Sequence, residues 1–444
     1  MTGRRVSIAS LAAYGALSFP LATIGLPLSI YLAPFYAGQL GVSLALLGTA
    51  MLVARFSDVV TDPLIGLLSD RWRPRIGRRR VWIVLGVPLL ALAVWMLFNP
   101  SRNAGVGYFL GWLALVYLAF TMTMLPYHAW GGEMSREYAE RSRITSARQV
   151  FGIAGLIAST LVPAWVLSRP EATPADVLHA LGLLMLVALP LGGMLLVFGV
   201  PHPEVTAAAE RLDLRRSIRQ LWRNPPFRRL NIVMLIGYAT ETFRITITLF
   251  FARDIVGVTN IGEIYVLYFV AGLVGVPFWL WLGNRIGKHR ALASAFIVVA
   301  FTSIALFSVQ HGNVTLFTGL FVAKGLCFGA LELLPASMFA DIADVDTAIS
   351  GERRQGLVFA VSQMVNKFGQ ALGQGLSLNL LALVGFQATG NSGPDALFWL
   401  RVLYCLAPAV ILITTIALLL RYPLTETRHS RLRRAIERRE GTTV

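Results

Sequence analysis

Twelve long apolar stretches run through this chain, and they limit its possible folds more than any other feature. A bilayer core is about 30 Å thick and is spanned by about 20 helical residues. Because lipid offers no partner to backbone polar groups, each stretch predicts a membrane-spanning helix. The predicted spans are residues 8–36, 42–69, 81–99, 106–130, 146–168, 177–200, 229–252, 261–283, 291–309, 314–339, 356–386 and 397–420. Only 14% of the residues are charged, which argues against a soluble protein.

The charged residues are distributed unevenly between the loops. Arg and Lys cluster at residues 71–80, 136–143, 211–229, 285–290, 353–354 and 428–439, and the intervening loops contain few of them. This asymmetry predicts a multi-pass protein of the cell (inner) membrane with both termini in the cytoplasm. The net charge of +16 could also suggest nucleic acid, but its placement beside the spans favours contact with anionic membrane lipids. We therefore expect no nucleic-acid partner.

The sequence lacks the motifs that are typical of a catalytic site. Its two cysteines, Cys327 and Cys405, both lie in predicted spans, so we expect neither a structural disulfide nor a zinc site. Neither a nucleophile elbow nor a paired His–Glu helix motif occurs. We expect no cofactor, and a monomer whose partner is a small-molecule or amphipathic substrate. The first stretch lacks a clear cleavage site, so we expect it to be retained rather than removed as a signal peptide.

The chain repeats its own plan. Three pairs of segments lie 210, 212 and 209 positions apart: GRRR at 77–80 with GKHR at 287–290, ERSR at 140–143 with ERR at 352–354, and Leu-Pro at 125–126 with 334–335. Similar spacings indicate two six-helix halves, with chance similarity of basic loops as the alternative. We predict a first half at 1–200, a cytoplasmic linker at 201–228, a second half at 229–421 and a basic cytoplasmic tail at 422–444.

Four segments resemble one transporter family. Residues 55–71 read RFSDVVTDPLIGLLSDR, residues 337–344 read SMFADIAD, residues 351–356 read GERRQG, and Lys367 is followed by Gly369. This combination resembles the glycoside–pentoside–hexuronide:cation symporter family. The resemblance implies an all-α major facilitator fold of 12 transmembrane helices in two pseudo-symmetric halves. It also implies cation-coupled transport by alternating access, with the substrate site between the halves.

Acidic residues in the second span suggest an ion site. Asp58 and Asp62 are four residues apart and share a helix face. Carboxylates in hydrocarbon persist only if they are paired, hydrated or neutralised by a cation. The resemblance places the coupling cation at these acids, and the hydroxyl groups of Thr61 and Thr121 would add oxygen ligands. The ion could be Na⁺ or H⁺, and the alternative is a buried Arg55–Asp58 ion pair without a bound ion.

The first-half substrate positions depart from the family. Two acids that hold sugar hydroxyls in relatives are replaced by Ala22 and Met124, and a tryptophan is replaced by His128. A substrate that is not a simple sugar is expected, because a sugar would leave polar groups unpaired. A lipid or amphiphile transporter, an exporter of the same fold, and a glycoside symporter despite the missing acids remain alternatives. Our candidate substrate residues are Ala22, Phe120, Met124, His128, Arg148, Glu241, Gln363 and Lys367.

Charges elsewhere suggest pairing and gating. Lys367 is a candidate counter-charge for the acids of the second span. Glu241 and Arg244, three apart, are expected to pair on one helix, and Lys324 and Glu332, eight apart, to share a face. Acids and arginines at the cytoplasmic ends would form a gate, as the resemblance implies. The gate candidates are Asp70, Arg79, Glu133, Arg141, Asp341, Asp344 and Arg353.

Overall fold

The computed structural model describes residues 5–72, 74–135, 137–201, 214–350 and 355–423, and these residues form helices without any strand. They divide into two compact units. Unit 1 comprises Met1–Ala209, Thr259–Val266 and Gln374–Gly393, and unit 2 comprises Glu210–Val258, Leu267–Gly373 and Pro394–Val444. Two short segments from the second half of the chain therefore pack with unit 1. The two compact units therefore differ from the two predicted six-helix halves, which are continuous in the sequence.

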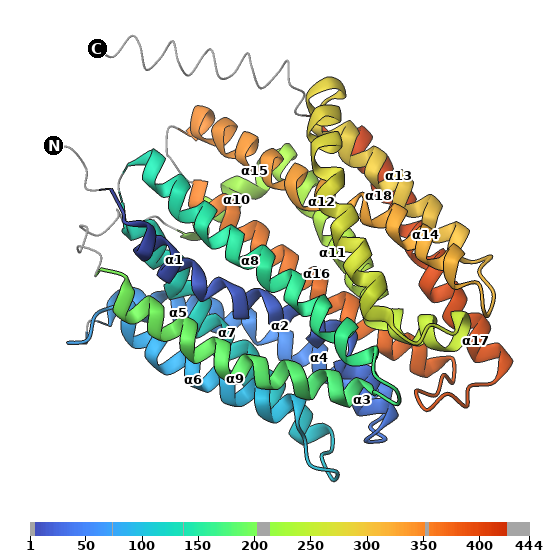
Figure 1. Cartoon of the computed structure of the whole chain (residues 1–444). Coiled ribbons are helices and arrows are strands. Elements are labelled where there is room, and N and C mark those ends of the chain that lie inside the picture. The colour runs from blue at the N-terminus through green and yellow to red at the C-terminus, as the bar shows by residue number, and fades with distance from the viewer. Residues whose placement is uncertain (1–4, 73, 136, 202–213, 351–354, 424–444) are drawn as a thin grey trace. The chain divides into compact units, whose positions relative to one another are not determined.

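Unit 1 is built from nine helices of the first 200 residues. They are α1 (Ile8–Ala16), α2 (Ser18–Ile30), α3 (Leu32–Gly38), α4 (Leu44–Phe56), α5 (Asp58–Arg71), α6 (Arg80–Phe98), α7 (Val106–Glu133), α8 (Tyr138–Leu167) and α9 (Pro174–Gly199). Helix α6 packs against α7 and α9, and α2 packs against α8 (Figure 1). The predicted span at 8–36 is three helices, interrupted at Leu17 and Tyr31. Pro20 and Pro34 follow these interruptions, and each lacks the N–H that would continue the helical ladder.

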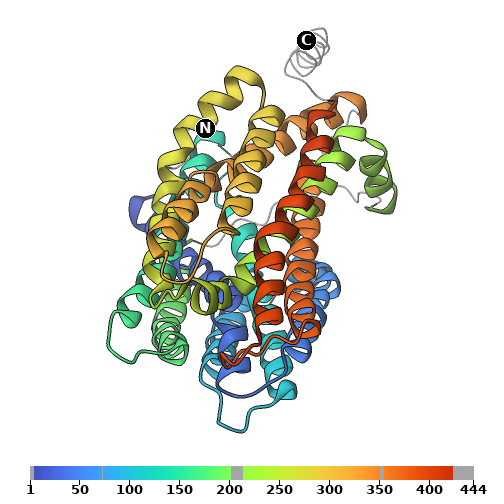
Figure 2. The same cartoon turned by 90° about the vertical axis from the view of Figure 1, so that its right-hand side faces the viewer.

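Unit 2 has its own helices. They are α10 (Leu214–Arg223), α11 (Pro225–Phe250), the π-helix η1 (Phe251–Val256), α12 (Ile261–Ile286), α13 (Lys288–Leu306), α14 (Val314–Gly325), α15 (Phe328–Ser350), α16 (Gln355–Leu383), α17 (Pro394–Arg401), the π-helix η2 (Val402–Leu406) and α18 (Ala407–Leu420). The start of α12 and the end of α16 belong to unit 1. Helix α18, red in Figure 2, packs against α11 and α13, and α15 packs against α13.

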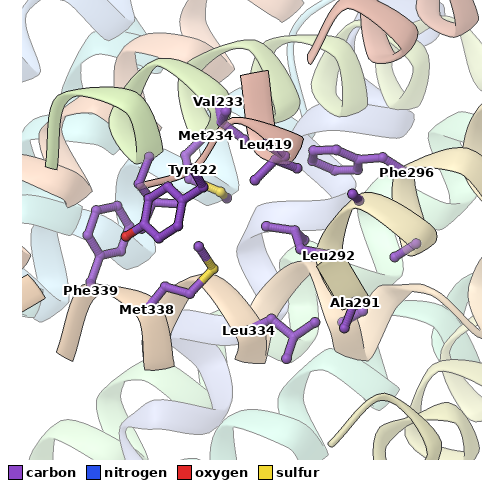
Figure 3. Close-up of a cluster of buried hydrophobic side chains, with 14 of the residues drawn as sticks. Val233, Met234, Ala291, Leu292, Phe296, Leu334, Met338, Phe339, Leu419 and Tyr422 are labelled. Carbon is purple, nitrogen blue, oxygen red and sulfur yellow. The ribbon is translucent and has the colours of Figure 1, made fainter. Parts of the chain in front are cut away.

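The core of unit 2 is a continuous apolar cluster (Figure 3). Met234 of α11 and Phe296 of α13 are buried with Met338 of α15 and Leu419 of α18. In a membrane protein such packing does not come from the hydrophobic effect alone, since lipid is as apolar as leucine; close van der Waals contact holds the helices together. The cluster fixes the helices that carry the charged residues of this unit.

Eleven segments of the described chain are long and apolar enough to cross a membrane. The predicted span at 356–386 is absent from that set, although α16 has 29 residues, or about 43 Å at 1.5 Å per residue. The cause is its composition, because Ser362, Asn366, Lys367 and Gln370 interrupt the apolar sequence. Polar residues inside a span typically face a bundle interior or a cavity rather than lipid. With α16 included, the count is the predicted twelve.

Both repeated basic loops contain a glycine with positive φ. Gly77, three residues before α6, has a φ of 107°, and Gly287, directly before α13, has a φ of 92°. Residues with a Cβ rarely adopt this region, so both positions favour glycine.

Close packing of α8 on α2 gives a testable result. A Cβ added at Gly155 would lie 2.1 Å from the Phe19 carbonyl oxygen, which belongs to rigid backbone. We expect Gly155→Ala to destabilise the protein by about 1–3 kcal/mol through overpacking. Gly111→Ala is the matched control, because a Cβ there meets nothing within 4 Å. Thermal unfolding of the purified protein should show a lower melting temperature for Gly155→Ala alone; equal values for the two variants would contradict this packing.

Candidate functional site

The paired acids of unit 1 lie beside a helix interruption. Helix α4 ends at Phe56 and α5 begins at Asp58, so Asp58 is in the first turn of α5. Its residue exposure is only 4%. Backbone N–H groups at the start of a helix favour a negative side chain there. Interrupted spanning helices often carry the ion sites of transporters, because the interruption leaves backbone groups available.

Asp62 bonds to a hydroxyl of another helix, and two further oxygen groups of α5 have no usual partner. The Thr121 hydroxyl, from α7, donates a hydrogen bond of 2.8 Å to the Asp62 carboxylate. The Thr61 hydroxyl oxygen is buried and has no hydrogen-bond partner within the described residues. Pro63 has no N–H, so the Val59 carbonyl lacks its usual helical donor. The structure thus brings the four predicted ion-site residues onto two packed helices, and the buried Thr61 hydroxyl suits a ligand to a hard cation.

The alternative of an Arg55–Asp58 ion pair is also visible. Arg55 Nη1 lies 3.4 Å from an Asp58 carboxylate oxygen. That distance is longer than the ~2.7–2.9 Å of a strong charge-assisted hydrogen bond. The guanidinium also lies over the Tyr117 ring, 4.3 Å from its centroid, which gives it a second stabilising contact. Arg55 can therefore remain stabilised by Tyr117 if a cation engages Asp58.

The two positions at which relatives carry sugar-binding acidic residues are occupied here by apolar side chains. Ala22 of α2 is half-buried, as are Phe120 and Met124 of α7. Phe120, Met124 and His128 follow one another at intervals of four and share a helix face. This face changes from apolar to polar toward His128.

A pocket in unit 1 brings together residues that the sequence assigned to different roles. It is lined by Tyr14, His128, Gly131, Gly132, Arg141, Ile144, Thr145 and Arg148. His128 and Arg148 were predicted to contact substrate, whereas Arg141 was predicted for the cytoplasmic gate. Tyr14 and Thr145 were missed. The spacing of Arg141, Thr145 and Arg148, at positions i, i+4 and i+7, could have shown that they share one face of α8.

The gate candidates form separate ion pairs in the two units. Glu133 at the end of α7 is held by Arg78 and Arg79, each at 2.6 Å. In unit 2, Asp341 pairs with Lys288 at 2.6 Å. Arg78 and Lys288 occupy equivalent positions of the internal repeat, and their carboxylate partners lie seven residues after Pro126 and six after Pro335. Each unit therefore ties its repeated basic loop to a carboxylate of another helix.

The other gate candidates lie at different places in the chain. Asp70 lies in α5 and Asp344 is exposed on α15. Arg353 lies outside the described residues. The gate between the two halves stays a prediction.

A buried charge cluster occupies unit 2. Glu241 pairs with Arg244, as predicted, and Lys324 Nζ lies 3.2 Å from the other Glu241 oxygen. The Arg244 and Lys324 side chains are 2% and 3% exposed. Lys324 and Glu332 lie on two successive helices, because α14 ends at Gly325 and α15 begins at Phe328. That the two residues share a helix face stays a prediction.

Glu332 lines a pocket together with Glu241 and Arg244, beside aromatic side chains including Tyr268 and Phe328. The two remaining substrate candidates, Gln363 and Lys367, lie one turn apart on α16, exposed and half-buried respectively. In the described part of the chain, no group of three or more His, Cys, Asp or Glu residues could hold a metal ion. The candidate ion site has only two carboxylates, so its remaining ligands would be hydroxyl and carbonyl oxygens.

Comparisons with known proteins identify the family of this chain. A family profile described as "MFS/sugar transport protein" matches residues 13–426. This chain belongs to the glycoside–pentoside–hexuronide:cation symporter family of the major facilitator superfamily. The inner membrane symporter YicJ of Escherichia coli is 26% identical, over 88% of this chain and 86% of its own.

Two further relatives concern substrate and fold. The human sodium-dependent lysophosphatidylcholine symporter 1 is 23% identical, over 87% of this chain and 78% of its own. Among solved structures, the nucleoside transporter NupG superposes with a TM-score of 0.67 at 13% identity, covering 94% of this chain and 100% of that one. At that identity the likeness shows the fold alone. The symporter is a multi-pass membrane protein of the 12-helix major facilitator fold, it couples transport to a cation, and it is not an enzyme.

Proposed function

We propose that this symporter is driven by Na⁺, bound in unit 1 by Asp58 and Asp62 with the hydroxyl groups of Thr61 and Thr121. The main support is the Asp62–Thr121 hydrogen bond of 2.8 Å, together with the buried hydroxyl of the neighbouring residue Thr61, which has no partner among the described residues. All of these ligands are oxygen, as hard cations prefer. One relative is named a sodium-dependent symporter. A proton would need only one carboxylate, whereas Na⁺ would also use the Thr61 hydroxyl, which has no partner among the described residues.

We further propose that the solute is amphipathic rather than a simple sugar. The half-buried Ala22, Phe120 and Met124 offer no hydrogen-bonding groups to a polyol. One relative is named for lysophosphatidylcholine, and others of similar identity are named for glycosides or glucuronides, so the apolar positions carry this proposal. Glu241, Gln363 and Lys367 of unit 2 would contact the polar part of the solute. Transport would proceed by alternating access, with Lys367 responding to the charge of the ion site.

Orientation and gating follow from the same proposal. The positive loops and both termini would face the cytoplasm, as the positive-inside rule predicts. Asp70, Arg79, Glu133, Arg141, Asp341, Asp344 and Arg353 would then lie at the cytoplasmic ends of the helices. The ion pairs of Glu133 and Asp341 would hold the two repeated loops rigid during the conformational change.

The identity of the ion is testable without knowing the solute. Anything that binds only the folded state stabilises it, by about 2.7 kcal/mol at 100 times its Kd. We expect Na⁺ to raise the melting temperature of the purified protein, and K⁺ or choline at equal ionic strength to have no such effect. Equal melting temperatures in all three salts, together with a stabilisation that depends only on pH, would replace Na⁺ with H⁺.

The substrate proposal predicts that restoring the two acids does not create a sugar site. We expect the double variant Ala22→Asp, Met124→Asp to remain without affinity for galactosides, because the surrounding face of α7 is apolar and cannot satisfy a polyol. Binding of melibiose and nitrophenyl galactoside is measured by calorimetry, with wild type as the reference. If the two acids create galactoside binding, the pocket is otherwise sugar-like and the amphipathic solute is refuted.

A further inference from the structure

The pocket at the polar end of the α7 face has an unusual charge balance. Arg141 and Arg148 of α8 face it together with His128 of α7, and none of its eight lining residues is acidic. The other lining groups are the Tyr14 phenol, the Thr145 hydroxyl, one isoleucine and two glycines. The pocket therefore contains hydrogen-bond donors and positive charge, with no carboxylate in its wall.

Nearby acids do not compensate this charge. Glu133 is engaged by Arg78 and Arg79, and Glu140 accepts hydrogen bonds of 2.7 and 3.0 Å from Arg143. Within the described residues, neither Arg141 nor Arg148 forms an ion pair, and the only bond of Arg141 to backbone is to the Ser135 carbonyl. Arg148 is half-buried within the predicted span at 146–168, whereas Arg141 is exposed at the start of α8. A guanidinium inside a span is costly unless it is paired or hydrated. A bound anion would supply such a partner to Arg148.

The wall of the pocket formed by Tyr14 is held by hydrogen bonds and close packing. Tyr14 and Tyr127 donate hydrogen bonds to each other's backbone carbonyl, at 3.3 and 2.8 Å, and both residues are 1% exposed. Gly131 lets the Tyr14 hydroxyl approach, since a Cβ there would lie 2.0 Å from that oxygen. At Gly132 a Cβ would meet nothing within 4 Å, so this part of the wall is open. Rigid walls hold donors in position for a ligand.

We propose that this pocket binds the acidic group, a carboxylate or a phosphate, of the transported solute. The inference rests on the proposed function and deepens it, because it defines the solute as an amphipathic organic anion. Guanidinium groups match the planar geometry of carboxylate and the oxygens of phosphate. The Phe120–Met124 side of the same α7 face would take the apolar part, and the Arg148 side would take the charge. His128 and Thr145 add donors to the same group.

The test uses pairs of ligands that differ only in the acidic group. Nitrophenyl glucuronide is compared with nitrophenyl glucoside, and lysophosphatidic acid with the monoacylglycerol of the same chain. Binding to the purified full-length protein in Na⁺ is measured by calorimetry. We expect the acidic member of at least one pair to bind about tenfold or more tightly than its neutral partner. The pair that shows the preference identifies carboxylate or phosphate as the acidic group.

Variants tie the preference to the pocket. Arg148→Gln should reduce it about tenfold, while Arg148→Lys retains part of it and the loop control Arg102→Gln leaves it unchanged. Wild type without preference for either acid, or Arg148→Gln with the full preference, would overturn the proposal. Na⁺ stabilisation is measured on the same samples. If Na⁺ stabilises wild type but acid preference is absent, only this inference fails; if Na⁺ has no effect, the proposed ion coupling fails independently.

Discussion

Asp62→Asn is expected to abolish the Na⁺-dependent rise in melting temperature. The substitution keeps the shape of the side chain but removes one of the two negative charges that would neutralise the ion. An amide oxygen cannot replace that charge in a site where Asp58 is only 4% exposed. The Thr121 hydroxyl, which donates to Asp62 at 2.8 Å, can still donate to the amide oxygen, so the helix packing should survive. The measurement is thermal unfolding across a Na⁺ titration.

Two comparisons make this result specific. Thr121→Ala removes one neutral oxygen and should weaken Na⁺ binding without abolishing it. Asp395→Asn, in the first turn of α17 in unit 2, is the matched control for loss of an aspartate charge and should leave the Na⁺ response intact. A full Na⁺ response in Asp62→Asn would remove Asp62 from the ion site. Loss of the response in Asp395→Asn would show that general charge, rather than the site, is responsible.

Glu241→Gln is expected to be the most destabilising of the conservative substitutions considered. Arg244 and Lys324 both bond to this carboxylate and are 2% and 3% exposed. Removing the carboxylate charge leaves two buried cations without their common partner, and breaking a buried ion pair typically costs about 3–5 kcal/mol. The Lys324 ammonium also lies 5.4 Å from the Tyr268 ring centroid, but a cation–π contact recovers only part of that loss. The melting temperature should fall sharply.

The control for charge balance lies in the same cluster. In the double variant Glu241→Gln, Lys324→Met one buried cation is replaced by an apolar side chain of similar length. It should therefore be more stable than Glu241→Gln alone, and the double-mutant cycle isolates the coupling between the two residues. A double variant no more stable than the single variant would mean that Glu241 acts through Arg244 or through packing. Conformational stability and not transport is the readout, so this prediction does not depend on the solute.

Much of the fold could be predicted from sequence because lipid imposes simple rules. Length, apolarity and the repeated basic loops gave twelve spans and an internal repeat, including α16, which composition alone excludes from the apolar set. The interruptions at Leu17, Ser57 and between Gly325 and Phe328 were not predicted. They depend on proline positions and on tertiary contacts that hydropathy cannot detect. For the same reason the sequence did not single out Glu241 as the partner of Lys324, which the structure shows.

At the candidate ion site, helical spacing was sufficient to place Asp58 and Asp62 on one face. The meeting of Thr121 with Asp62 was anticipated only through the family resemblance, since the two residues are far apart in the chain. The arginine pocket was not predicted as a unit. Its members lie on α1, α7 and α8, and only the packing of these helices shows that Arg141 and Arg148 share a cavity.

The proposed Na⁺ site and the proposed acid pocket together have an electrical consequence. One Na⁺ and one monovalent organic anion crossing together move no net charge. Membrane potential, worth about 2.3 kcal/mol per elementary charge per 100 mV, would then do no work on the cycle. Uptake would follow the sodium gradient alone and would be insensitive to valinomycin-imposed voltage. A doubly charged phosphate would instead carry one net negative charge inward, against an inside-negative potential.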